Sequence, residues 1–444
     1  MDDLTAGLSA LAESQESYET AHRYYKGSVA EVFASPRMRR AIRNSGVDVR
    51  FNFAKKPVDA VADRLELAAI TGPDEASTQA LQEIWETNAL GLEAPNIMRR
   101  ACEYGDAYVL VWPADPEVSR VNVFYNSPET CRVIYDQENP LEKSFAIKRW
   151  ADRCDLYYPD RIEKYVLRKG AKPNEASSWE QYTDDEGDEW PYENPYGEVP
   201  VFHFRTDRPY GEPLHFGFYG PQDAINKLII SHLSSVDYQA GPQRYAMLEA
   251  DADTAEAEDD DFEFGADDDE GAGSPEATSN LSSAPGSVWW LRDVKGVGQF
   301  ESAKPEVFTD PMLTYLRMGA DITSTPLHRI DPTTVVPSGE AFRACEGPFV
   351  KKVNGLQRSF GATWEEAFTF ALRVYQGAEV KTQVDVRWAP AQTVEDKDFW
   401  DTAKLKIEAG VPPYQVLLEA GYTAEQMAAW GVEPNESVPA SQGE

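Results

Sequence analysis

The feature that most constrains this chain is an abrupt change of composition between residues 323 and 376. Residues 325–339 contain three prolines, a Thr-Thr pair and a Ser-Gly pair. Proline has no amide hydrogen to donate, so this stretch is predicted to be an extended loop. Immediately afterwards, apolar residues recur every three or four positions and predict one long helix over 341–376. They are Phe349, Val350, Val353, Leu356, Phe360, Trp364, Phe368 and Leu372.

The predicted helix is long for a globular protein. A continuous helix over 341–376 would extend about 54 Å at its usual rise per residue. Ser338 is placed to cap its N-terminus, and Pro348 is expected to kink it near its first turns. A rigid loop that leads into a long kinked helix favours a scaffold for a large assembly over a small enzyme.

Length and composition bound the class of protein. The 444 residues predict two to four domains, and 42% hydrophobic residues exclude a wholly disordered chain. The net charge of −34 disfavours ordinary tight binding to DNA. Four cysteines without metal-ligand spacing are expected to be reduced thiols. No signal peptide and no apolar run of 18 residues is found, so we expect a protein without membrane spans, made in a cytoplasm.

Helices and strands are both predicted. Helices are expected within residues 1–70, over 76–104 as one element, over 221–239, from Asp310-Pro311 onward, and as two or three short elements within 395–430. Residues 249–276 carry 14 acidic residues and no Lys or Arg, which is typical of a mobile surface loop. Strands are expected at 107–112, 118–125, 131–135, 145–150, 161–167, 201–204, 287–291, 297–300 and 380–388.

Catalytic patterns were sought and not found. The sequence contains no dinucleotide, P-loop, HExxH or GxSxG motif, and its five histidines stand alone. Pairs of carboxylates occur by chance among 76 acidic residues, so they do not indicate a glycosidase. We therefore predict no catalytic residues, no metal and no cofactor.

The order of several short motifs resembles the portal proteins of long-tailed double-stranded DNA phages, in the branch common among actinobacterial phages. The resemblance spans roughly residues 20–430, whereas the acidic segment 249–276 does not match and looks like an insertion. The motifs are specific through their order and spacing, not one by one. They include YYKG at 24–27, NFAKKPVD at 52–59, YGDAYV at 104–109, NPYGEVPV at 194–201, QDAINKL at 222–228, ITSTP at 322–326, PSGEA at 337–341 and WEE at 364–366.

The resemblance implies an α+β multidomain portal fold that forms a ring, usually of twelve subunits. Residues 1–220 and 341–395 would form the wing, and the helices 221–240 and 308–323 the stem. Residues 241–307 would be the clip, including the insertion 249–276. The tunnel loop would be 324–340, and 396–444 would be the crown with a polar tail.

The resemblance also implies a function and partners. The ring would be the channel at one capsid vertex through which double-stranded DNA is packaged and ejected. Terminase, a head-tail adaptor, the major capsid protein and scaffolding protein would be partners, in a virion assembled in the host cytoplasm. The expected channel residues are Lys227 and Arg317 in the stem, with His328, Arg329, Thr333, Thr334, Val335 and Val336 in the tunnel loop. The alternatives are another structural ring protein of the connector or tail and, less favoured, a carbohydrate-active enzyme.

Overall fold

The structure is a computed structural model in which the chain forms two compact units. The first contains Met1–Ala30, Arg50–Gln222 and Leu316–Glu444, and the second contains Glu31–Val49 and Asp223–Tyr315. The described residues are 2–28, 51–113, 121–183, 190–240, 244–248, 294–299, 306–331, 339–376, 384–392, 396–419, 427 and 430–432.

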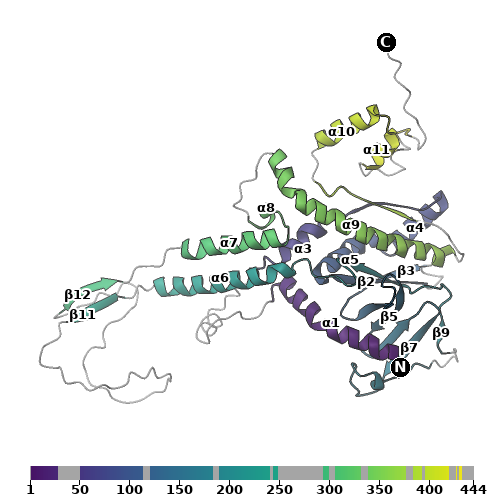
Figure 1. Cartoon of the computed structure of the whole chain (residues 1–444), viewed down its shortest axis with the longest axis horizontal. Helices are drawn as coiled ribbons and strands as arrows, with labels where there is room; N and C mark the ends of the chain where they lie inside the picture. Colours follow the sequence, from purple (N-terminus) through teal and green to yellow (C-terminus); the bar gives the residue numbers. More distant parts are fainter. Residues whose placement is uncertain are drawn as a thin grey trace, which may run out of the picture. The chain divides into compact units, whose positions relative to one another are not determined.

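In the first unit, the strands between residues 131 and 193 form a six-stranded antiparallel sheet (Figure 1). Its order is β4-β5-β6-β7-β8, and β9 pairs with β7. Helix α1 (Asp2–Lys26) packs on this sheet because Leu4, Leu8 and Leu11 lie on one face of the helix and are at most 2% exposed. The elements are β4 (Cys131–Tyr135), β5 (Lys143–Arg149), β6 (Arg153–Tyr157), β7 (Arg161–Leu167), the 3-10 turn η1 (Ala176–Ser178), β8 (Trp179–Gln181) and β9 (Tyr192–Glu193).

A second antiparallel sheet of the first unit has the order β10-β2-β3. Its central strand β2 carries Val109 and Val111, which are fully buried, in line with the prediction of a buried strand over 107–112. Helix α5 packs on β2 and β10. The elements are α3 (Lys55–Ala62), α4 (Glu75–Thr87), α5 (Leu90–Tyr104), β2 (Asp106–Pro113), β3 (Val121–Asn126) and β10 (Val201–Arg205).

The long helix α9 (Gly339–Gln376) is continuous over 38 residues, which confirms the helix predicted over 341–376. It lies across β10, β2 and β13 and against α4 (Figure 1). Trp364, in its C-terminal half, is fully buried in the largest core of the unit. Pro348 lies inside the helix, and Figure 1 shows the helix bending near its N-terminal end. Strand β13 (Asp385–Trp388) pairs with β1 (Leu67–Thr71) in a separate two-stranded sheet.

Helices α6 (Tyr219–Ala240) and α7 (Glu306–Ile322) each contribute residues to both units. Within the second unit they lie side by side, and the rings of His232 and Phe308 are 5.2 Å apart. The second unit also holds the hairpin of β11 (Arg244–Leu248) and β12 (Val294–Gln299). In the first unit, α10 (Asp396–Glu408) and α11 (Pro413–Glu419) confirm two of the short helices expected within 395–430. The acidic segment 249–276 and the strand expected at 287–291 lie outside the described residues.

The prediction of one helix over 76–104 is wrong, because the chain breaks between α4 and α5. Ala89 has a left-handed φ of 50°. The Asn88 side chain accepts a hydrogen bond from the Val123 amide and donates one to the Val121 carbonyl, both of 2.9 Å. Asn88 thus binds the edge of β3 and ends α4, although the apolar spacing continues across the break.

The prediction that α7 opens at Asp310-Pro311 is also wrong, since the helix begins at Glu306. Pro311 lies in its second turn and removes one main-chain hydrogen bond, a loss that the rest of the helix tolerates. Five of the described strands were missed: β1, β6, β8, β9 and β11. In the part of the chain that the structure describes, no helix has the length and apolarity needed to cross a membrane.

Candidate functional site

The C-terminal end of α7 turns sharply into α8 (Leu327–Ile330), and this corner opens the segment 324–340 that is expected to form the tunnel loop. Ser324 takes a left-handed φ of 52°, and the buried hydroxyl groups of Thr323 and Thr325 lie 2.8 Å apart. From α9, the Lys352 ammonium donates a 2.9 Å hydrogen bond to the Thr323 carbonyl. Burial lowers the pKa of Lys352. The corner is therefore tied directly to the long helix.

Close packing also fixes α7 against the 3-10 turn η2 (Phe216–Phe218). A Cβ atom added at Gly319 would lie 2.4 Å from the Phe218 ring, and one at Gly217 would lie 2.5 Å from the Ile322 side chain. Only glycine allows this approach. Around the contact, large apolar side chains remain uncovered: Phe216, Met318 and Ile322 are 54%, 52% and 59% exposed. We call these three residues the apolar patch.

The prediction of an extended loop over 325–339 is wrong in its first part, because α8 is one helical turn. Pro326 precedes its first residue, where the missing amide hydrogen costs nothing. His328 on α8 points toward Glu346 of α9, with 3.7 Å between Nε2 and Oε1. Glu346 is 2% exposed, and Arg64 approaches the same oxygen at 3.8 Å. Burial lowers the pKa of His328, and Glu346 opposes that shift.

The structure places some of the predicted channel residues and not others. Arg317 on α7 and Arg329 on α8 are both exposed, and neither forms an ion pair with a described residue. Lys227 is exposed on α6. The remaining four, Thr333, Thr334, Val335 and Val336, lie outside the described residues.

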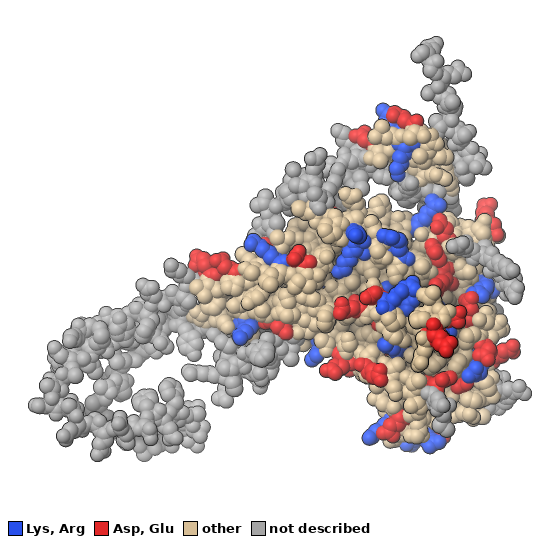
Figure 2. Space-filling view, in the orientation of Figure 1, with Lys and Arg blue, Asp and Glu red and all other residues tan. Residues whose placement is uncertain are grey.

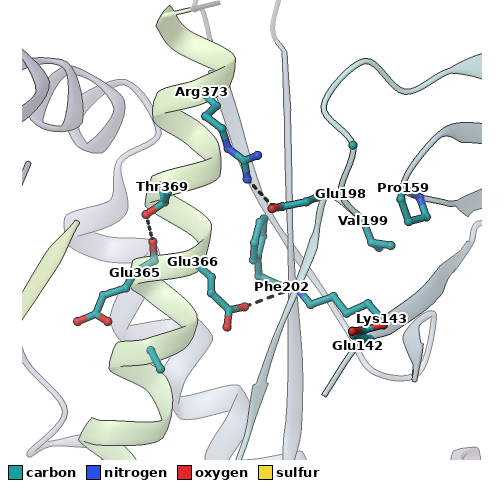
Figure 3. Close-up of a pocket in the computed structure, with 12 residues that line it drawn as sticks. Glu142, Lys143, Pro159, Glu198, Val199, Phe202, Glu365, Glu366, Thr369 and Arg373 are labelled. Atoms are coloured by element: carbon teal, nitrogen blue, oxygen red, sulfur yellow. Dashed lines mark hydrogen bonds and ion pairs between the residues drawn. The ribbon is translucent and has the colours of Figure 1, made fainter. Parts of the chain in front are cut away.

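A cavity of about 570 Å³ lies between α9 and the two sheets (Figure 3). Two ion pairs cross it: Lys143 with Glu366 at 3.6 Å and Arg373 with Glu198 at 2.5 Å. The Lys143 ammonium also lies 4.4 Å from the centre of the Phe202 ring. Burial lowers the pKa of Lys143. Two further carboxylates, Glu142 and Glu365, also line the cavity.

The arrangement that most resembles an acid-base catalytic site, His203 with Asp106, is buried away from solvent. His203 Nε2 and the Tyr18 hydroxyl each lie 2.7 Å from an oxygen of Asp106, and the Gly211 amide donates to the same carboxylate. The Tyr135 hydroxyl lies 2.9 Å from the other ring nitrogen of His203. The His203 and Asp106 side chains are each 1% exposed. This network therefore joins α1 to the two sheets and offers no access to a substrate. Among the described residues, no cluster of three metal-ligating side chains exists.

Sequence reasoning missed the residues that hold the corner. Lys352 lies beside the apolar stripe of α9, a position at which a lysine side chain is ordinarily exposed to solvent. Glu346 lies near the N-terminal end of the predicted helix, where an acidic residue is favourable without any partner. Their partners, Thr323 and Arg64, are 29 and 282 positions away in the sequence, so no local pattern signals either contact.

The comparisons with known proteins agree on one family. The family model described as "Phage portal protein, SPP1 Gp6-like" matches residues 9–436. The portal protein of Mycobacterium phage D29 is 23% identical over 399 residues, which cover 85% of this chain and 77% of that protein. The portal protein of Mycobacterium phage L5 is 23% identical over 396 residues with the same coverage.

Solved structures of gene transfer agent particles are also similar. A chain in the neck of the empty particle, computed with C6 symmetry, gives a TM-score of 0.47 at 14% identity, covering 91% of this chain and 96% of that one. A chain of the native virion gives a TM-score of 0.40 at 13% identity, covering 94% and 99%.

Proposed function

Because the chain belongs to the SPP1 Gp6-like family of phage portal proteins, we propose that it is one subunit of a closed ring that conducts double-stranded DNA. The match of the family model over residues 9–436 carries this conclusion. The protein is a structural component of a phage particle, and the family is not catalytic. This family membership favours the portal over a different ring protein of the connector or tail.

Assembly into a ring is supported by the apolar patch. Soluble monomers rarely leave several large apolar side chains together and uncovered, and such patches mark interaction sites. Met318 and Ile322 at the end of α7 and Phe216 on η2 are each more than half exposed. A neighbouring subunit that covers them would gain roughly 25 cal/mol for each Å² of apolar surface buried. Twelve subunits are our expectation for the complete ring.

The domain assignment of the sequence is retained as a proposal. The wing would be 1–220 and 341–395, which lie in the first unit except for residues 31–49, and the crown would be 396–444. Residues 241–307 would be the clip, and the helices 221–240 and 308–323 the stem that walls the channel. The division into two units supports the clip in this assignment, because residues 241–307 lie wholly within the second unit. Residues 324–340 would be the tunnel loop.

The proposed channel holds DNA loosely. DNA carries one charge per about 1.7 Å of its axis, and each neutralised phosphate adds affinity and drag. Arg317, Arg329 and Lys227 are the exposed cations we assign to the channel, and they are few in a chain of net charge −34. His328 is less suited to contact DNA because its side chain is only 22% exposed beside Glu346. Thr333, Thr334, Val335 and Val336 would narrow the bore without binding phosphate.

Partners follow from the same role. We propose that the clip binds terminase during packaging and a head-tail adaptor afterwards, and that the wing contacts the major capsid protein and scaffolding protein. Assembly would take place in the host cytoplasm. The first test is sedimentation of the purified chain. Particles near twelve times the 49.6 kDa subunit mass support the proposal. A single 49.6 kDa species at every protein concentration would contradict it.

A further inference from the structure

A closed ring requires two different faces of the subunit that fit each other, because each subunit contacts its neighbours head to tail. Figure 2 shows acidic and basic side chains interspersed over the face it presents, so net charge alone does not single out such a face. The outer surfaces of two long helices of the first unit do differ in charge. Helix α1 packs on the six-stranded sheet and α9 on the three-stranded sheet, and Figure 1 shows them on opposite sides of the sheets.

The outer surface of α9 carries two cations that have no partner in the subunit. Lys351, Gly355, Arg358 and Ala362 follow one another at steps of four, three and four residues, and all four are exposed. This spacing places them on one face of the helix, away from the core. Neither cation forms an ion pair with a described residue, and α9 has no acidic residue three or four positions from either of them. We call these four residues the basic stripe.

Gly355 leaves a gap between the two cations. A Cβ atom added at this position would meet no described atom within 4 Å beyond its own helix backbone. Glycine is the least favourable residue in a helix interior apart from proline, so an exposed position with free space ordinarily carries a larger residue. Glycine does allow another backbone to approach closely. The packing of the single subunit makes no use of this gap, and a neighbouring chain can.

The outer surface of α1 carries the opposite charge. Ser9, Glu13, Glu16 and Thr20 follow one another at the same steps of four, three and four residues, on the side away from the buried leucines of α1. Both glutamates are exposed, neither forms an ion pair with a described residue, and α1 has no Lys or Arg three or four positions from either. Residues three apart are neighbours on a helix surface, so the two carboxylates repel each other. We call these four residues the acidic stripe.

The two stripes fit each other in spacing and in size. Lys351 and Arg358 are about 10 Å apart along the axis of α9, and Glu13 and Glu16 are about 4.5 Å apart along α1. The two glutamates can therefore enter between the two cations, above Gly355, with one carboxylate beside each cation. Packed helices lie about 8–10 Å apart according to the side chains at the contact, and a glycine at the contact favours a short separation.

We infer that α1 of one subunit packs against α9 of the next subunit in the ring, with the acidic stripe on the basic stripe. This inference rests on the proposed ring and names two helices that close it. One subunit cannot pair its own two stripes, because they lie on opposite sides of the first unit, whereas copies arranged head to tail pair every stripe. Charge also selects this pairing, because α1 against α1 or α9 against α9 would bring like charges together.

The first test is a charge swap. One variant carries Glu13→Lys and Glu16→Lys, a second carries Lys351→Glu and Arg358→Glu, and a third combines all four. Two control variants repeat each change of net charge at exposed positions outside the stripes: Glu86→Lys with Glu93→Lys, and Lys169→Glu with Lys404→Glu. Mass photometry measures the protein concentration at which half of the subunits are in rings. Thermal unfolding of the separate subunits, below the concentration of assembly, checks the fold.

Each double variant should raise the half-assembly concentration at least about tenfold at low salt, and less at high salt, where charges are screened. The fourfold variant should return to within about threefold of the wild type, and the controls should not move. Rings that assemble equally well in all variants would remove this contact and leave the proposed ring intact. Failure of the fourfold variant to recover, with its subunits folded normally, would also contradict direct pairing. A wild type without rings would overturn the proposed function and this contact with it.

The second test, Gly355→Gln, fills the gap without changing the charge. Glutamine favours a helix more than glycine does, so the separate subunits should unfold at the same or a higher temperature. The half-assembly concentration should nevertheless rise at least about tenfold, because the added side chain holds the neighbouring helix away. Gly91→Gln, at an exposed glycine of α5, is the control and should leave assembly unchanged. Assembly of the Gly355→Gln variant at the wild-type concentration would contradict the proposed packing.

Discussion

The Lys352 ammonium lies 2.9 Å from the Thr323 carbonyl oxygen and joins the N-terminal half of α9 to the end of α7. The carbonyl groups at a helix C-terminus have no partner inside the helix, and a cation stabilises them. Lys352 is half-buried, so this bond is partly sheltered from water. The contact fixes the direction in which the chain leaves α7 toward the proposed tunnel loop.

Replacing Lys352 by Met should lower the free energy of unfolding by roughly 1–3 kcal/mol, because the buried Thr323 carbonyl loses its charged donor. Methionine keeps most of the volume, so the effect reports the bond and not a cavity. The control is Lys351→Met on the exposed side of α9. Equal stability of the two variants in urea unfolding would show that the bond contributes nothing.

A pH effect is expected from His215, which is fully buried and donates to the Ala21 carbonyl at 2.9 Å. Burial lowers the pKa of His215 to about 4. In the unfolded chain this histidine binds a proton near pH 6.5. The free energy of unfolding should therefore fall by up to roughly 3 kcal/mol as the pH is lowered from about 6.5 to 4. His215→Gln, which keeps a donor, should remove this part of the pH dependence. An unchanged slope in the variant would mean that His215 is not the group responsible.

Asp155 should act in the opposite direction over a similar range. It is 2% exposed on β6, and burial raises its pKa to about 6, although Arg153 lies 3.2 Å away. The folded chain therefore retains a proton that the unfolded chain has lost, and stability falls as pH rises from about 4 to 6. Asp155→Asn should stabilise the protein at pH 7 by up to about 3 kcal/mol. A loss of stability at pH 7 would show that the Arg153 pair outweighs the cost of burial.

The elements that were predicted well from the sequence are those whose own pattern of apolar side chains determines whether they form a helix or a strand. The strands over 131–135 and 161–167 match β4 and β7 in both bounds, and α9 follows from its apolar stripe. The missed strand β1 has the sequence LAAIT, whose alanines favour a helix. It is a strand because it pairs with β13, more than 300 residues away. Tertiary pairing of this kind leaves no local pattern.

The candidate site was predictable only in part. The motif order located the chain segments that form α7, α8 and α9, but not the contacts among them. The cavity draws Lys143, Glu198 and Glu366 from three distant segments, and each alone looks like an ordinary surface charge. Thr333, Thr334, Val335 and Val336 remain predictions.

Replacing Thr333 and Thr334 by Lys should leave ring formation unchanged but impair DNA packaging or retention. Two added cations in each subunit would convert a constriction without charge into a collar that binds phosphate, and the defect should fade at higher salt. Packaging assays with particles that carry the variant portal measure this effect. The control carries Lys at the exposed positions Gln82 and Thr87 of α4. Normal packaging by the Thr333, Thr334 variant would place these residues outside the channel.

The central claim is that this chain closes into a ring around a channel. Electron microscopy of the purified full-length protein tests it most directly. We predict closed rings with a central hole, and in averaged images a bore walled by α6 and α7. Monodisperse single subunits at high protein concentration, or closed particles without a central hole, would contradict the account.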